Sequence, residues 1–189
     1  MNNAMNKNIF LLSTLVFTLL MNQALAENKA ALQHKSASLQ CLDRKIELQA
    51  DCFQEDGVPG LSCTRQSLRF SNAADNKILS SRIFKTAPKD ADQDYPVVPD
   101  KINDLVCVAT PQDEKYIVTK IDNGGNCDQC EWAEVYSWDG ILIGSDRDKK
   151  KKNIVVKAAV AAAFGAKTKK IIDKKDLTNF YQGAGHNGD

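Results

Sequence analysis

The chain has 189 residues, with 25 Lys and Arg against 24 Asp and Glu. This length suits one ordinary domain with a small appendage and excludes several large domains. The net charge of +1 by itself implies nothing about the partners of the protein. The charge is nevertheless uneven, because residues 27–146 carry 13 Lys and Arg against 20 Asp and Glu, whereas residues 147–189 carry 11 against 4. The sequence therefore describes an acidic body followed by a basic tail.

Residues 1–26 have the pattern of a cleavable signal peptide. Lys7 precedes the apolar run Ile9–Leu20, and Ala24-Leu25-Ala26 supplies the small residues that a signal peptidase accepts. The apolar run is much shorter than the roughly 20 residues needed to cross a bilayer, which argues against a membrane anchor. We therefore expect cleavage after Ala26 and a periplasmic or secreted protein.

All six cysteines lie beyond this segment, and an even number of cysteines in an oxidising compartment predicts disulfides. They are Cys41, Cys52, Cys63, Cys107, Cys127 and Cys130. Sequence alone leaves their pairing open. The pair that we favour is Cys52 with Cys63, because Gly57, Pro59 and Gly60 lie between them and can turn the chain back on itself.

The first half of the body has the pattern of short antiparallel strands. Residues 27–38 are polar and lack a period, which predicts a flexible segment or one short helical turn. Apolar and β-branched residues then alternate through segments separated by turn residues. The predicted strands are 42–52, 61–70 and 77–85. Residues 86–100 contain three prolines and four aspartates, so they are expected to form an extended surface connection.

The second half repeats this strand pattern and ends in a different kind of segment. Strands are predicted at 105–110, 115–122, 130–138 and 141–143, and Asp139-Gly140 marks the last hairpin. Residues 154–165 are rich in alanine, and their apolar spacing predicts a helix. The predicted fold is α+β and mainly β. It is a disulfide-stabilised antiparallel meander over residues 39–146, forming a sandwich or small barrel, followed by a basic helical tail over residues 147–189.

One predicted strand carries a row of aromatic residues on a single face, with a carboxylate in the middle. The row has two interpretations: it lies in the core, which is the usual place for tryptophan, or it is an exposed patch that anchors a partner. The core is the favoured interpretation. The candidate partner-binding residues on this strand and its turn are Glu131, Trp132, Glu134, Tyr136, Trp138 and Asp139.

Few residues suggest catalysis or a cofactor. Cys127-x-x-Cys130 admits a zinc half-site or a redox pair, but a structural disulfide is favoured because no helix is expected to start there. His34 and His186 are the only histidines, and both lie near the chain ends in segments expected to be mobile. We therefore predict no catalytic residue, no metal and no cofactor.

These features favour an exported, non-enzymatic binding protein. It would occlude a partner, as an inhibitor or immunity protein does with a secreted or periplasmic hydrolase or toxin. The acidic body favours a basic protein partner through electrostatic steering, and nucleic acid is not expected as a partner of an exported chain.

The basic tail has three interpretations: packing on the acidic body, attraction to an anionic lipid surface, or contact with nucleic acid. Packing on the body is favoured, since the two parts carry opposite charge. The alternative function is an envelope-associated structural or adaptor protein, whose tail makes a peripheral contact with the membrane or with cell-wall polymer.

Overall fold

The structure is a computed structural model that describes residues 29–91, 93–127, 129–148, 153–165 and 170–183. The signal peptide predicted for residues 1–26 lies outside the described residues. The described elements are the strands β1 (Gln33–Cys41), β2 (Arg44–Gln54), β3 (Leu61–Asn72), β4 (Ile78–Ile83), β5 (Lys101–Ala109), β6 (Lys115–Asp122), β7 (Glu131–Ser137), β8 (Leu142–Ser145) and β9 (Ile171–Asp176), and the helix α2 (Ile154–Phe164).

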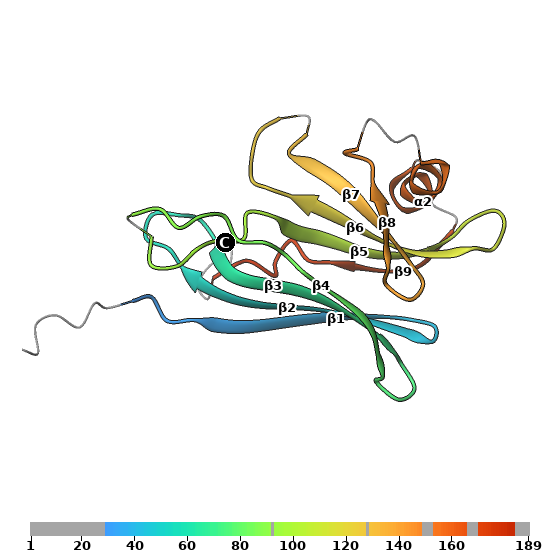
Figure 1. The fold of residues 1–189 in the computed structure, drawn as a ribbon, viewed down its shortest axis with the longest axis horizontal. Coiled ribbons are helices and arrows are strands. Elements are labelled where there is room, and N and C mark those ends of the chain that lie inside the picture. Colours follow the sequence, from blue (N-terminus) through green and yellow to red (C-terminus); the bar gives the residue numbers. More distant parts are fainter. Residues whose placement is uncertain (1–28, 92, 128, 149–152, 166–169, 184–189) are drawn as a thin grey trace, which may run out of the picture.

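The strands form two antiparallel sheets that face each other as a sandwich (Figure 1). The first sheet has the order β1-β2-β3-β4, and the second has the order β8-β7-β6-β5-β9. A single apolar core fills the space between them, with contributions from every strand of the first sheet except the short edge strand β4. The prediction of a mainly β, antiparallel fold with a helix near the carboxyl terminus is confirmed.

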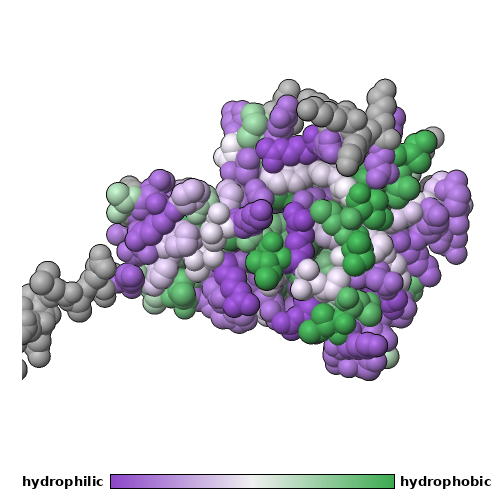
Figure 2. Space-filling model, in the orientation of Figure 1, coloured by the Kyte–Doolittle hydropathy of each residue, from purple (hydrophilic) through white to green (hydrophobic). Residues whose placement is uncertain are grey.

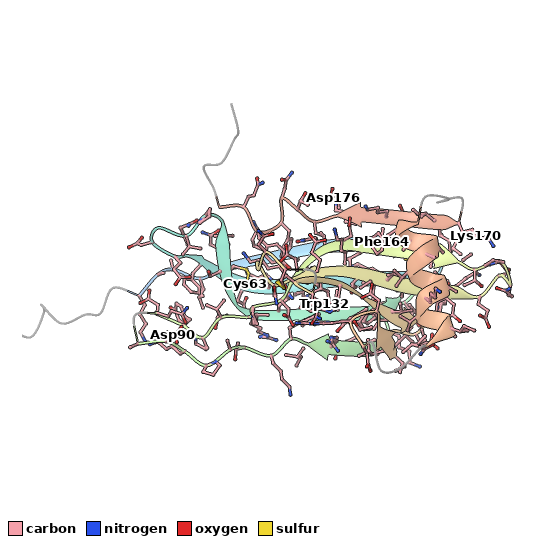
Figure 3. All side chains as sticks on the ribbon, turned by 90° about the horizontal axis from the view of Figure 1, so that it is seen from above. Cys63, Asp90, Trp132, Phe164, Lys170 and Asp176 are labelled. Carbon is pink, nitrogen blue, oxygen red and sulfur yellow. A yellow bond between two sulfur atoms is a disulfide. The ribbon has the colours of Figure 1, made fainter. Side chains whose placement is uncertain are left out.

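The two sheets differ in how their outer faces are covered. In β2, buried Ile46, Leu48 and Ala50 alternate with more exposed residues, which is the pattern of a sheet with one solvated face. In the second sheet the outward-facing Ala133 and Val135 are also buried, because α2 packs over them. Seen from above, α2 crosses the strands of this sheet steeply (Figure 3).

All six cysteines are paired in disulfides, as predicted, and no cysteine is free among the described residues. The favoured pair, Cys52 with Cys63, is confirmed and links neighbouring strands β2 and β3. Cys41 pairs with Cys107 and so joins β1 of the first sheet to β5 of the second. Cys127 pairs with Cys130 inside the loop between β6 and β7.

The prediction that residues 27–38 form a flexible segment or a short helical turn was wrong for the second half of that segment. Residues 33–41 form β1, which pairs with β2 along its whole length. The polar residues of β1 face solvent, while Leu39 and Cys41 at its end are buried in the core. The strand was missed because only these last positions carry an apolar signal.

The prediction of a basic helical tail over residues 147–189 was only partly correct, because the tail also contains a strand. Within the described residues of the tail, α2 is the one helix, and Ile171–Asp176 forms β9, which pairs with β5. Without β9, β5 would be an edge strand with a row of unpaired backbone groups. The boundary predicted at residue 146 therefore divides the second sheet, which takes its last strand from the tail.

Residues beyond β9 close the end of the sandwich that lies far from α2. The Tyr181 hydroxyl donates a hydrogen bond to Gln66 Oε1 and accepts one of 2.9 Å from the backbone N–H of Ile102. Burial raises the pKa of Tyr181 well above its ordinary value. The tail thus contributes a satisfied polar group to the core as well as a strand.

We predict that the double variant C41A/C107A loses about 2–5 kcal/mol of unfolding free energy, because this bridge closes the longest loop of the three. Urea denaturation monitored by tryptophan fluorescence measures the loss. The variant C127A/C130A is the control and should lose much less, since its residues are only 3 apart in sequence. Equal losses would contradict this account.

Candidate functional site: the hairpin end

Four hairpin turns meet at one end of the sandwich, at the right of Figure 1, and we call them together the hairpin end. They are the β1–β2 turn (42–43), the β3–β4 turn (73–77), the β5–β6 turn (110–114) and the β7–β8 turn (138–141). The linker after β4 and the β6–β7 loop lie at the opposite end. The hairpin end is therefore a surface made of turns, the kind of surface on which β-sandwiches commonly place binding residues.

The backbone is unusual at each of these four turns. Among the described residues other than glycine, a positive φ occurs only at Leu42, Asn76 and Asp113, and Gly140 has the same property in the fourth turn. Asn and Asp tolerate this conformation, but a bulky residue does so at a cost of about 1–3 kcal/mol. Leu42 has a φ of 55° at the first position of a two-residue turn, where glycine is the usual residue.

Large apolar side chains are exposed at the hairpin end. The exposed fractions are 58% for Leu42, 61% for Ile141, 56% for Ile78 and 43% for Leu142. Figure 2 shows hydrophobic residues gathered on the right half of the visible face, over β4, β8 and α2, with hydrophilic residues around them. Exposed apolar groups bordered by polar ones are typical of protein interaction sites.

Hydrogen bonds tie the turns to one another. The Trp138 indole N–H donates to Asp43 Oδ1 at 2.9 Å, and the Arg44 guanidinium donates to Asp139 Oδ1 at 2.9 Å. Both contacts join the β1–β2 turn to the β7–β8 turn, across the two sheets. The backbone N–H of Ala73 donates to the carbonyl of Asp43 at 2.9 Å and so adds the β3–β4 turn.

Gly140, in the β7–β8 turn, is required by close packing as well as by its positive φ. A Cβ on Gly140 would lie 2.2 Å from a ring carbon of Phe70 and 2.3 Å from the Ser80 hydroxyl. The Ser80 hydroxyl in turn donates to the carbonyl of Asp139 at 2.8 Å. The β7–β8 turn is therefore seated directly on the first sheet, and the exposed apolar tips are held in fixed positions.

Asp43 at the hairpin end interacts with an indole N–H and with nearby positive charges. The hydrogen bond from Trp138 is the largest cause that lowers the pKa of Asp43 below its ordinary value, and the charges of Arg44 and Lys115 lower it further. The Lys115 ammonium lies 5.9 Å from the centroid of the Trp138 ring. Asp43 thus remains ionised, and able to accept these contacts, at any pH near neutrality.

The structure places three of the six candidate partner-binding residues in the core, which is the interpretation that the sequence favoured for the aromatic row. Trp132, Glu134 and Tyr136 are buried between the sheets, so they are not a surface for a partner. Trp132 is the second residue of β7, and Figure 3 shows it near the middle of the molecule, away from the hairpin end. Their place among the candidate partner-binding residues is therefore corrected.

Glu134 is buried because it has two partners inside the sandwich. It accepts a hydrogen bond of 2.7 Å from Arg82 of β4 and one of 2.5 Å from the Tyr136 hydroxyl. Burial, together with the neighbouring Glu134 carboxylate, raises the pKa of Tyr136 far above its ordinary value. The carboxylate in the middle of the aromatic row thus forms an ion pair between the two sheets.

The other three predicted residues separate into two places. Glu131 is exposed at the far end of β7, where it pairs with Lys120 at 2.7 Å. Trp138 and Asp139 alone lie at the hairpin end. The prediction missed Leu42 and Ile141, although each belongs to a tight turn between two alternating segments.

The remaining sequence candidates lie elsewhere. His34 was expected in a mobile segment but is held on β1, with Nδ1 2.8 Å from Asp51 Oδ1, and His186 lies outside the described residues. Cys127 and Cys130 form a disulfide rather than a zinc half-site. Within the described ranges no group of three or more His, Cys, Asp and Glu residues is placed to hold a metal ion.

Comparison with models of protein families, with curated proteins and with solved structures found no match for this chain. No helix in the described part of the chain is long and apolar enough to cross a membrane. Three disulfides are typical of proteins that fold in an oxidising compartment.

We predict that Trp138→Phe raises the pKa of Asp43 toward the ordinary value of aspartate, because the indole N–H that favours the charged form is lost. In the parent protein this contact stabilises the fold above the ordinary pKa, and the stabilisation is lost as the pH falls through the lowered pKa. NMR titration of the side-chain carboxyl carbon measures the pKa of Asp43 in the parent protein and in the variant. Asp176, whose pKa is lowered by Thr178, is the internal control and should not change.

Proposed function

We propose that this is an exported, non-enzymatic binding protein that occludes a protein partner with its hairpin end. A secreted or periplasmic hydrolase or toxin is the class of partner that fits best, and the role is then that of an inhibitor or immunity protein. The compartment proposed is the periplasm or the cell exterior, in agreement with the predicted signal peptide.

One observation carries this proposal: the exposed apolar tips Leu42 and Ile141 stand on turns that hydrogen bonds lock together. A sequence gains nothing for its own folding from a leucine that is 58% exposed at a positive φ. A rigid apolar tip does help binding, since little conformational freedom is lost when it enters a partner's pocket. Tips of this kind suit a concave site, such as the substrate cleft of an enzyme.

The charge of the molecule supports a basic partner. Residues 27–146, which supply eight of the nine described strands, carry 13 Lys and Arg against 20 Asp and Glu. An acidic body accelerates encounter with a basic protein, whereas the apolar tips set how slowly the complex dissociates. Binding should therefore weaken with added salt mainly through the association rate.

The adaptor alternative is less well supported. In α2, Val156, Ala159 and Ala163 face the second sheet and are buried there, so these apolar residues are not available to a lipid surface. If the mature chain sediments with anionic vesicles at low salt, and loses this property without residues 147–152, the adaptor function replaces the one proposed.

The test is an affinity capture experiment. The protein that begins at Glu27 and matched variants of it are each used to capture a partner, and the amounts captured are compared. Leu42→Ser and Ile141→Ser should each weaken capture about tenfold or more, as expected for loss of an apolar anchor. Leu32→Ser is the control, because Leu32 is 49% exposed but precedes β1 at the other end of the sandwich. Equal capture by all four proteins would overturn the assignment to the hairpin end. A hydrolase partner should also lose activity when bound.

We predict that Leu42→Gly separates stability from binding. Removing the strained leucine should leave the unfolding free energy unchanged or raise it by up to about 1 kcal/mol, since strain relief is offset by the freedom of glycine in the unfolded chain. Partner affinity should fall about tenfold or more. Urea denaturation and surface plasmon resonance measure the two quantities. A parallel fall of both would show that Leu42 serves the fold.

A further inference from the structure

The loop between β6 and β7 carries a disulfide that is accessible from solvent. Cys127 is exposed, whereas Cys130 is only 7% exposed. Gly124 and Gly125 precede the bridge and place no side chain over it. A Cβ on Gly125 would lie 2.3 Å from Cys130 Sγ, so only glycine fits beside the buried sulfur. The Cys127 side of the bridge is thus exposed, whereas the Cys130 side is buried.

The other two disulfides have the opposite character. Cys41, Cys52, Cys63 and Cys107 are at most 2% exposed, and each of their bridges joins two strands. Their residues are 66 and 11 apart in sequence, against 3 for the exposed bridge. A bridge over so short a loop removes the least conformational entropy from the unfolded chain, so it contributes least to folding.

The loop is closed by other contacts as well. The backbone N–H of Asn123 donates to the carbonyl of Cys130 at 3.1 Å. Directly below, Asp122 pairs with Glu131 in the β6–β7 ladder, and Lys120 pairs with the Glu131 carboxylate at 2.7 Å. The loop therefore retains its anchorage when the sulfurs are apart, and opening the bridge leaves both sheets intact.

From this geometry we propose that Cys127–Cys130 is a thiol–disulfide exchange site whose reaction partner is a dithiol. A thiolate of the dithiol attacks the exposed Cys127 Sγ, which forms a mixed disulfide and releases Cys130 as a thiolate that takes up a proton. The second thiol of the dithiol then attacks its own sulfur in the mixed disulfide and releases Cys127. In sum the dithiol loses two electrons and two protons to the protein, and the reverse reaction reoxidises the pair.

This site is separate from the hairpin end. β6 and β7 run from the loop to the turns, so the two features lie at opposite ends of the sandwich (Figure 1). Exchange at the loop should leave partner binding by the hairpin end unchanged. Failure of one proposal therefore leaves the other standing.

The test uses the folded, oxidised chain incubated with increasing dithiothreitol, followed by alkylation, proteolysis and mass spectrometry. Cys127 and Cys130 should become alkylated at a dithiothreitol concentration at least about tenfold below that needed for the other four cysteines. At that concentration the circular dichroism spectrum should not change.

Two variants make the result decisive. Cys130→Ser leaves Cys127 as a free thiol, and its thiolate should attack oxidised glutathione, form a stable mixed disulfide and release one reduced glutathione. Cys127→Ser leaves only the buried sulfur, which should form this adduct at least about tenfold more slowly. If all three bridges open together, or if both variants react equally fast, the proposal is overturned.

Discussion

The disulfide between Cys41 and Cys107 is the constraint on which the rest of the structure depends. It is wholly buried and joins the last position of β1 to β5, so it fixes the two sheets relative to each other at one end of the core. Leu42 follows Cys41 directly, and its turn is therefore built on a covalent link to the opposite sheet. A leucine in a strained turn persists where the surrounding structure determines its conformation, and here the bridge does so.

The same end of the molecule is reinforced by polar contacts between the sheets. Asp43 and Arg44 in the first sheet engage Trp138 and Asp139 in the second, and further inside Arg82 meets Glu134. These contacts explain why β7 and the turn that follows it hold both core and surface residues. Up to Tyr136 its inward side chains are enclosed by the first sheet, and beyond it the strand emerges into the turns.

The two ends of the sandwich offer different chemistry. The hairpin end presents apolar tips beside Asp43 and Asp139, which both pair with Arg44, and this combination suits recognition of another protein. The far end presents a disulfide over a short loop in which Cys127 is exposed and Cys130 is buried, and this arrangement suits exchange with thiols. The strands between the ends are long and cross-linked, so each end can change without disturbing the other.

The sequence by itself determined the alternation of the central strands, the helix α2, the Cys52–Cys63 pair and the hairpin at Asp139-Gly140, because each depends on residues close together in the chain. Tertiary structure alone decided the placement of β1 and β9, which have weak patterns of their own and form because β2 and β5 supply unpaired backbone groups. It also decided the site. Glu134 is buried only because Arg82 lies 52 residues away in sequence and 2.7 Å away in space, and Leu42 belongs to a surface only because four distant turns meet at one end.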